Sequence, residues 1–202
     1  DRKNGFGYNL YWSPDSKMLA FIDETNTIYV IGVENGKIKT AGNNRWNIGH
    51  GGRYGYPVSW SPDSKWITFT EQLDNSNSAI FVYNTGEEKK SQITSGFYED
   101  GYPVFSTDGK YIFYLTNRNM DAAYSALGDG TWIYPNTTQI ASISLKAETP
   151  SLLVAKNDTV AMKKDEPADA KENAGEKAKS EEKKDGKEDK KKEDKIKVEI
   201  DF

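Results

Sequence analysis

Residues 55–69 read GYPVSWSPDSKWITF, and related stretches stand before and after them in the chain. The earlier stretch, residues 7–21, reads GYNLYWSPDSKMLAF, and the later one, residues 101–114, reads GYPVFSTDGKYIFY. Their turn aspartates, at positions 15, 63 and 108, are 48 and 45 residues apart. A period of roughly 40 to 50 residues with several short strands per unit is typical of β-propeller blades.

Each stretch begins a predicted four-stranded antiparallel blade. In the second copy the strands are expected at Pro57–Trp60, Trp66–Thr70, Ala79–Tyr83 and Gln92–Thr94. Residues 61–65, SPDSK, predict the turn between the first two strands. In such a turn proline presets φ, and the Asp and Ser side chains hydrogen-bond the backbone.

The other two copies follow the same plan. Strands are expected at Met18–Ile22 and Thr27–Ile31 in the first copy, and at Tyr111–Thr116, Gln139–Leu145 and Ser151–Ala155 in the third. The third copy also carries an insertion, residues 117–138. The predicted fold class is all-β: a partial β-propeller of about three four-stranded blades within residues 1–160. The blades are expected at about residues 7–50, 55–97 and 101–156.

Residues 161–195 are predicted to be a disordered, low-complexity charged linker. Within them, residues 163–195 hold 12 Lys and 12 Asp or Glu, with no aromatic and no β-branched residue. Such a segment cannot bury enough apolar surface to offset the entropy lost on ordering. Residues 196–202, IKVEIDF, are expected to form the first strand of a following domain.

Composition excludes several classes of function. Residues 1–162 carry 14 Lys or Arg and 17 Asp or Glu, a net charge of −3. Nucleic-acid binders present a basic surface to the phosphates, so we predict no nucleic-acid partner. No apolar run approaches the roughly 20 residues of a membrane span. With no cysteine, one histidine and no calcium-loop motif, we predict no metal and no cofactor.

Residues just before the first strand of each blade are expected to approach the propeller axis. The sequence therefore predicts that His50, Arg53, Tyr54, Glu99 and Asp100 face a central channel. The alternative is that they are solvated loop residues, as loop residues commonly are. A Ser-His-Asp site needs a histidine as its base, and only His50 could serve. No catalytic role is assigned to His50 or to the other four residues.

Aromatic residues divide into those that recur between blades and those that do not. Recurring aromatic positions predict packing between neighbouring blades. They are Trp12, Trp60 and Phe105, and Phe21, Phe69 and Phe113. Tyr124, Trp132 and Tyr134 stand in the insertion and have no equivalents. They are expected to contact substrate, a neighbouring subunit or another domain.

The repeat resembles that of TolB-type and tricorn-type propellers, in which Ser-Pro-Asp-Ser-Lys precedes a hydrophobic strand. YSAL at residues 124–127 and DGTWIYPNTTQI at residues 129–140 are similar to a stretch in the first propeller of bacterial tricorn-like serine peptidases. The charged linker followed by IKVEIDF resembles their passage into a second propeller.

This resemblance implies a non-catalytic propeller segment that guides or gates peptides toward a catalytic domain elsewhere in the same polypeptide. Its implied partners are the remaining blades, the catalytic domains and peptide substrates. Three blades do not close a ring, since propellers have about four to eight. Self-association into a homo-oligomer stays open, as does the compartment: the periplasm or cell envelope, or the cytoplasm, of a prokaryote.

Two other functions remain open on the sequence. One is a TolB-like propeller that acts only as a protein-binding module. The other is the propeller of a prolyl-oligopeptidase-type enzyme, which requires an α/β-hydrolase domain with a Gly-x-Ser-x-Gly motif. That motif is not in this sequence. The charged linker before Ile196 favours the tricorn-type interpretation over both.

Overall fold

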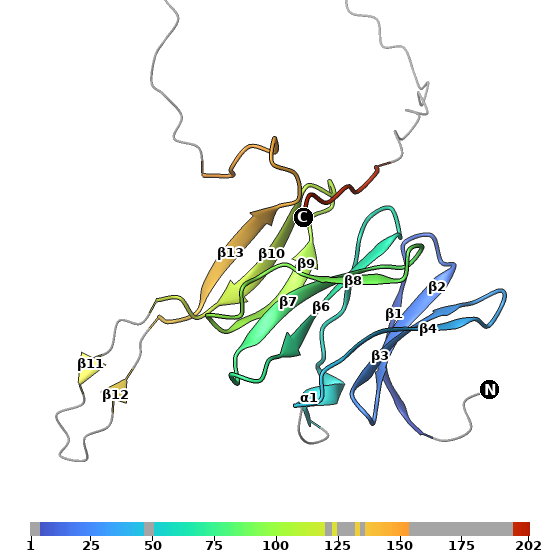
Figure 1. Cartoon of the computed structure of the whole chain (residues 1–202), viewed down its shortest axis with the longest axis horizontal. Coiled ribbons are helices and arrows are strands. Elements are labelled where there is room, and N and C mark those ends of the chain that lie inside the picture. Colours follow the sequence, from blue (N-terminus) through green and yellow to red (C-terminus); the bar gives the residue numbers. More distant parts are fainter. Residues whose placement is uncertain (1–4, 47–50, 120–122, 125–131, 134–135, 154–195) are drawn as a thin grey trace, which may run out of the picture. The chain divides into compact units, whose positions relative to one another are not determined.

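The chain is described by a computed structural model that covers residues 5–46, 51–119, 123–124, 132–133, 136–153 and 196–202. It is an all-β segment of a β-propeller, apart from one helical turn, α1 (Gly51–Tyr54). Each blade is an antiparallel sheet whose strands pair in the order in which they follow along the chain (Figure 1).

Blades 1 and 2 each have four strands. Blade 1 consists of β1 (Gly7–Trp12), β2 (Met18–Asp23), β3 (Thr27–Gly32) and β4 (Ile38–Asn43). Blade 2 consists of β5 (Ser59–Trp60), β6 (Trp66–Gln72), β7 (Ser78–Asn84) and β8 (Lys89–Gln92). Blade 2 lies between the others, with β5 against β1, β8 against β4, and its first three strands against β9 (Asp100–Phe105) of blade 3.

Blade 3 has three strands among the described residues: β9, β10 (Tyr111–Thr116) and β13 (Gln139–Ser144). The insertion between β10 and β13 contains a short antiparallel pair, β11 (Ala123–Tyr124) and β12 (Trp132–Ile133). The fourth strand expected at 151–155 is absent from residues 151–153, and residues 154–155 lie outside the described part. After β13, Thr149 N–H donates to the Lys146 carbonyl oxygen at 3.1 Å and turns the chain away from the sheet.

The outer strand of blade 2 begins and ends earlier than the sequence predicts. It was expected at Gln92–Thr94 and lies at Lys89–Gln92. The reason is a side-chain bond: Ile80 N–H on β7 donates to Thr94 Oγ1 at 3.0 Å, in place of a backbone carbonyl. After one further backbone bond, from Ile93 N–H to the Ile80 carbonyl oxygen at 2.8 Å, the hydroxyl of Thr94 ends the ladder.

The three Ser-Asp turns share one network of hydrogen bonds. In each turn the serine hydroxyl donates to the aspartate two residues later, at 2.6 Å in Ser13–Asp15, 2.6 Å in Ser61–Asp63 and 2.5 Å in Ser106–Asp108. The same serine oxygen accepts the N–H of the next strand's first residue, at 2.9 to 3.0 Å. The hydrogen bond from Ser106 holds the pKa of Asp108 below its ordinary value.

The core lies between the blades, where the recurring aromatic residues were expected to pack. Trp60 and Phe105 are buried, and each contacts the blade before it through a hydrogen bond. Trp12 holds the same repeat position in blade 1 and is 55% exposed. Among the described residues, no blade packs against this face of blade 1. Trp12 is therefore exposed because the face it lies on has no neighbouring blade among the described residues.

Residues 196–202 belong to the same compact unit as the blades. They carry no strand assignment and lie against blades 2 and 3, with Val198 buried. The segment bonds to the Asp63 side chain of blade 2 and to residues 145 and 147, which follow β13. That the segment begins a following domain stays a prediction.

Candidate functional site

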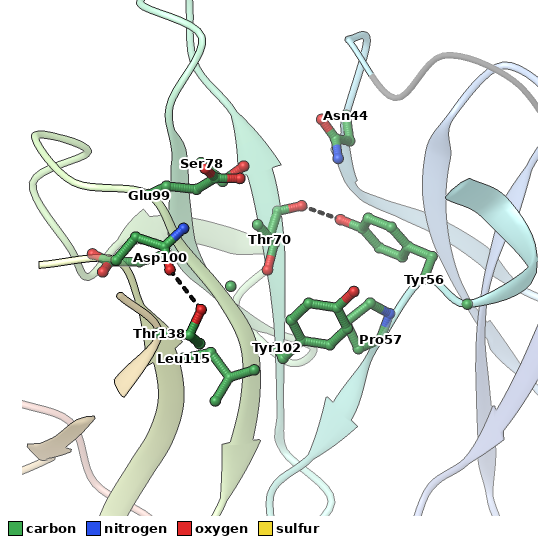
Figure 2. A pocket seen from close by; sticks show the side chains of 13 residues that line it. Asn44, Tyr56, Pro57, Thr70, Ser78, Glu99, Asp100, Tyr102, Leu115 and Thr138 are labelled. Atoms are coloured by element: carbon green, nitrogen blue, oxygen red, sulfur yellow. Dashed lines mark hydrogen bonds between the residues drawn. The ribbon is translucent and has the colours of Figure 1, made fainter. Parts of the chain in front are cut away.

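A cleft of about 410 Å³ opens between blades 2 and 3 (Figure 2). Most of the lining residues lie at or near the start of the first or third strand of a blade, or near the end of its second strand. Asn44 instead follows the last strand of blade 1. The lining residues are Asn44, Gly55, Tyr56, Pro57, Thr70, Ser78, Glu99, Asp100, Gly101, Tyr102, Leu115, Asn117 and Thr138.

Antiparallel pairing explains why residues so far apart in sequence meet here. In each blade the first strand starts beside the end of the second strand, and the third strand starts there too. Asp100 thus pairs with Thr116 across β9 and β10, and Ser78 pairs with Gln72 across β7 and β6. One end of the blades collects all these strand ends, and the cleft lies at that end.

Tyr56 forms part of the wall that blade 2 contributes to the cleft. Its side chain is buried, and its hydroxyl donates to the backbone carbonyl oxygen of Thr70 (Figure 2). The Tyr11 hydroxyl of blade 1 donates to the Tyr56 carbonyl oxygen at 2.7 Å. Burial raises the pKa of Tyr56 well above 10.0, and the nearby Glu71 carboxylate raises it further. Tyr56 is therefore a neutral phenol that fixes the position of the wall.

Asp100 is the buried charge of the cleft, with 1% of its surface exposed. Its Oδ2 pairs with Arg118 Nη2 at 3.4 Å. The Arg118 guanidinium lies 5.2 Å from the ring centre of Tyr98 and 5.8 Å from that of Tyr114. These aromatic faces hold the cation beside Asp100, since a ring face attracts a guanidinium. Burial raises the pKa of Tyr114, so this ring also stays neutral.

Two buried side-chain oxygens of the cleft have no hydrogen-bond partner among the described residues: Thr70 Oγ1 and Asp100 Oδ1. Buried polar atoms are nearly always paired in folded proteins, and leaving one unpaired costs about 1–3 kcal/mol. Both residues line the same cleft. Both atoms are closed to solvent beneath the surface of the cleft, so a bound molecule that donates to them must displace the side chains around them.

The mouth of the cleft is partly aromatic and partly polar. The Tyr102 ring is 61% exposed. Figure 2 shows Asn44, Tyr56 and Pro57 on one wall, and Glu99, Asp100, Leu115 and Thr138 on the other. On the second wall the Thr138 hydroxyl donates to Asn117 Oδ1 at 3.0 Å, and Asn117 N–H donates to the Glu99 carbonyl oxygen at 3.1 Å.

The predicted channel-facing residues fall into three groups. Glu99 and Asp100 line the cleft. Arg53 and Tyr54 do not: Arg53 Nε donates to Asn26 Oδ1 at 2.8 Å, and the Tyr54 ring packs edge-on against Tyr8 with centres 5.1 Å apart. His50 lies outside the described residues. That these residues face a channel stays a prediction.

Of the predicted insertion contacts, Tyr124 and Trp132 are register partners in the pair β11–β12. Tyr134 lies outside the described residues. The contacts of these three aromatic residues with substrate or with another chain also stay a prediction.

Sequence reasoning missed most of the cleft, including Tyr56, Thr70 and Tyr102. A signal for two of them was present, because Gly-Tyr-Pro stands at the same place in the second and third repeats. For Thr70 the sequence gives no such signal, since what matters is the missing partner of its hydroxyl.

Metal-ligand clusters and membrane-spanning helices are both absent from the described ranges. No group of three or more His, Asp or Glu side chains there could hold a metal ion. No helix in the same ranges has the length and apolar character needed to cross a bilayer.

Comparison with known proteins adds structural neighbours. No protein-family model matches the sequence, and no curated protein sequence matches it. The chain is similar to the crystal structure of the tricorn protease, with a TM-score of 0.64 and 19% identity over 75% of this chain and 14% of that chain. TolB from Acinetobacter baumannii gives a TM-score of 0.43 and 19% identity over 62% of this chain and 30% of that one.

The similarity to the tricorn protease concerns the fold, and at 19% identity it shows the fold alone. The chain is a β-propeller segment and spans about 14% of the tricorn protease chain.

Proposed function

We propose that this chain is a non-catalytic propeller segment of a tricorn-like serine peptidase, and that it binds peptides in the cleft between blades 2 and 3. In this proposal it guides or gates peptides toward a catalytic domain elsewhere in the parent polypeptide. The alternative is a propeller that binds a protein partner without any linked peptidase.

The observation that carries the proposal is the pair of unpartnered buried oxygens, Thr70 Oγ1 and Asp100 Oδ1, in one cleft. A peptide supplies an N–H group at nearly every residue, so it has the donors that such oxygens require. Binding would then remove the cost of leaving these oxygens unpaired.

The rest of the lining also suits a peptide. An exposed tyrosine at the mouth, Tyr102, offers a large apolar face and a hydroxyl, which is the combination enriched where proteins bind peptides and proteins. The charged lining residues are Glu99 and Asp100, and Arg118 offsets one of the two charges. We therefore expect peptides with a free amino terminus or basic side chains to bind better than acidic ones.

Peptide binding can be measured with fluorescein-labelled peptides of about ten residues, basic and acidic in matched pairs, titrated with the 202-residue chain. Tyr102→Ala should weaken binding of the basic peptide by roughly tenfold, the usual size of a loss at a contact residue. Phe97→Ala is the control, because Phe97 is an exposed aromatic residue outside the cleft. Equal affinity in wild type and Tyr102→Ala, or no binding of either peptide, would overturn the cleft as a peptide site.

The link to a peptidase is tested separately by sequencing the coding region beyond Phe202. A second set of blade repeats, followed by a domain with a nucleophilic serine, supports the peptidase. If the repeats end with no catalytic domain, the binding module is the correct alternative, whatever the outcome of the peptide titration.

A further inference from the structure

The C-terminal segment, residues 196–202, bonds to both blade 2 and blade 3. Val198 N–H donates to Asp63 Oδ2 in the turn of blade 2 at 3.0 Å. Asp201 N–H donates to the Leu145 carbonyl oxygen of blade 3 at 2.9 Å, and Asp201 Oδ2 accepts the Ala147 N–H at 3.0 Å. These contacts lie at the ends of the blades where the Ser-Asp turns are, so this site is distinct from the cleft.

Residues in this segment alternate in character, and of its apolar residues Val198 is buried, Ile200 is partly buried and Ile196 is 44% exposed. The β-branched residues Ile196, Val198 and Ile200 alternate with charged ones. Val198 is 3% exposed. It packs in a cluster with Val82, Phe105, Ile112 and Leu145, against which Trp66, Ile93 and Ile200 also pack. Both blades contribute to this apolar groove.

The charged face of the segment is also matched. Glu199 pairs with Lys146 of blade 3 and with its neighbour Lys197. The hydrogen bonds from these lysines, that of Lys146 first, lower the pKa of Glu199 to about 2. The Glu199 carboxyl is therefore ionised at every pH well above 2.

Gly109 shows that the turn of blade 3 is adapted to this segment. The equivalent turn positions in blades 1 and 2 are Ser16 and Ser64, with φ values of 60° and 61°, and Gly109 has a φ of 69°. Ser64 Oγ accepts the Asp15 N–H at 3.0 Å and so joins the turns of blades 1 and 2. A Cβ on Gly109 would lie 2.8 Å from Val198 Cγ2 and 3.1 Å from Ile196 Cγ2.

Residues 196–202 thus hold the position between the turns of blades 2 and 3 that the Ser64 side chain holds between the turns of blades 1 and 2. Where Ser64 links blade 2 back to blade 1, Val198 links blade 2 to blade 3 by bonding Asp63 and filling the space over Gly109. A Cβ at position 109 would come closer to Val198 than real Cβ contacts do, so a serine there forces Val198 to shift and weakens the seat of the segment.

We infer that the groove at the turn ends of blades 2 and 3 is a peptide-binding site for an extended segment with β-branched residues at every second position, and that Ile196–Phe202 is its occupant, bound in cis. The predicted linker at residues 161–195 tethers this occupant. The occupant and the groove belong to one polypeptide, so binding is intramolecular, and the high effective concentration of a tethered partner keeps even a weak site filled. The inference does not depend on the peptide cleft or on a linked peptidase.

Amide hydrogen exchange on the full chain tests this inference. Val198 and Asp201 N–H groups should exchange roughly tenfold or more slowly than in the free peptide of residues 195–202, because both donate to protein oxygens. In Gly109→Ser this protection should decrease. Gly36→Ser is the matched control, since Gly36 has a φ of 62° and nothing within 4 Å of an added Cβ.

The fold of each variant is checked by the exchange of Thr68 and Val82 amides in β6 and β7, which should remain slow. If Gly109→Ser keeps the protection of Val198 and Asp201, the inference is wrong. A second measurement applies even if Gly109→Ser fails to fold. Val198→Asp should displace the chain's own segment from the groove. The labelled peptide of residues 195–202 should then bind this variant at least tenfold more tightly than it binds wild type, whose groove is already filled. No binding to Val198→Asp would equally overturn the inference.

Discussion

Thr68 and Thr70 lie two residues apart on β6, and only Thr68 has a partner for its hydroxyl. Thr68 Oγ1 donates to the Phe81 carbonyl oxygen at 2.9 Å, whereas Thr70 Oγ1 is buried without a partner among the described residues. Replacing an unpaired buried hydroxyl by a methyl group of the same shape removes an unfavourable term. Thr70→Val should therefore stabilise the chain by about 1 kcal/mol and weaken peptide binding.

The control for this prediction is Thr68→Val, which deletes a satisfied hydrogen bond and should cost about 1 kcal/mol. Urea unfolding followed by fluorescence gives both values, and the peptide titration gives the affinity of Thr70→Val. A Thr70→Val chain that loses stability would show that the hydroxyl is already satisfied, and the cleft would lose its main argument.

Trp60 connects blades 1 and 2 through its indole. Its Nε1–H donates to the Tyr11 carbonyl oxygen at 2.9 Å. Trp60→Phe keeps an aromatic ring but loses this bond and part of the packing, so we expect a loss of about 1–3 kcal/mol of unfolding free energy. Trp12→Phe is the matched control at the equivalent repeat position, where the side chain is exposed, and it should change stability by less than about 0.5 kcal/mol. Equal losses in the two variants would contradict the assignment of Trp60 to the interface between blades.

Glu71 joins blades 1 and 2 by a second route. Its buried carboxylate accepts the Asn43 N–H of blade 1 at 2.9 Å and pairs with Lys90 Nζ at 2.7 Å. Glu71→Ala leaves both donors without this partner and should cost about 2–3 kcal/mol. Glu88→Ala removes an exposed carboxylate that pairs with Lys39 at 3.1 Å, and it should have little effect, as expected of surface ion pairs. Thermal and urea unfolding measure the loss of stability in each variant. Equal losses in Glu71→Ala and Glu88→Ala would contradict the prediction that the buried carboxylate contributes more than the exposed one.

The inner part of each blade could be predicted from the sequence. The strand expected at Tyr111–Thr116 is β10 with the same bounds, because a run of β-branched and aromatic residues follows a well-defined turn. Outer strands were less predictable. At Thr94 a side-chain hydroxyl replaces the backbone acceptor, and in blade 3 the chain turns away after β13. Both outcomes depend on contacts that the local sequence does not encode.

Long-range contacts also explain why the sites were only partly predicted. Glu99 and Asp100, expected to face a channel because they precede a strand, line the cleft between blades 2 and 3, and their facing a channel stays a prediction. The role of Gly109 was hidden, because its sequence shows only a glycine where two other repeats have serine. The reason lies in Val198, far along the chain and beyond the charged linker, which fills the space over Gly109.

Tyr56 should make stability depend on alkaline pH. Burial raises the pKa of its phenol well above the ordinary value of 10.0, so the folded chain keeps the proton while the unfolded chain begins to release it near pH 10. The stabilisation from this neutral phenol is complete below pH 10 and is lost as the pH rises from 10 toward the raised pKa. Tyr56→Phe removes this proton, so its unfolding free energy should fall less steeply than that of wild type between about pH 9 and pH 11, roughly one pH unit on either side of the ordinary tyrosine pKa.

Urea unfolding at a series of pH values measures this slope. Tyr56→Phe also loses the hydroxyl bond to the Thr70 carbonyl oxygen, so its stability at pH 8 should be lower by about 1 kcal/mol. The remaining decline above pH 10 is expected to come partly from Tyr83 and Tyr114, whose pKa values burial also raises. Tyr102→Phe, which alters an exposed ring, should retain the wild-type slope. If Tyr56→Phe and wild type lose stability in parallel above pH 10, Tyr56 ionises as freely in the folded chain as in the unfolded one. The placement of Tyr56 as a buried side chain in the wall of the cleft would then be wrong.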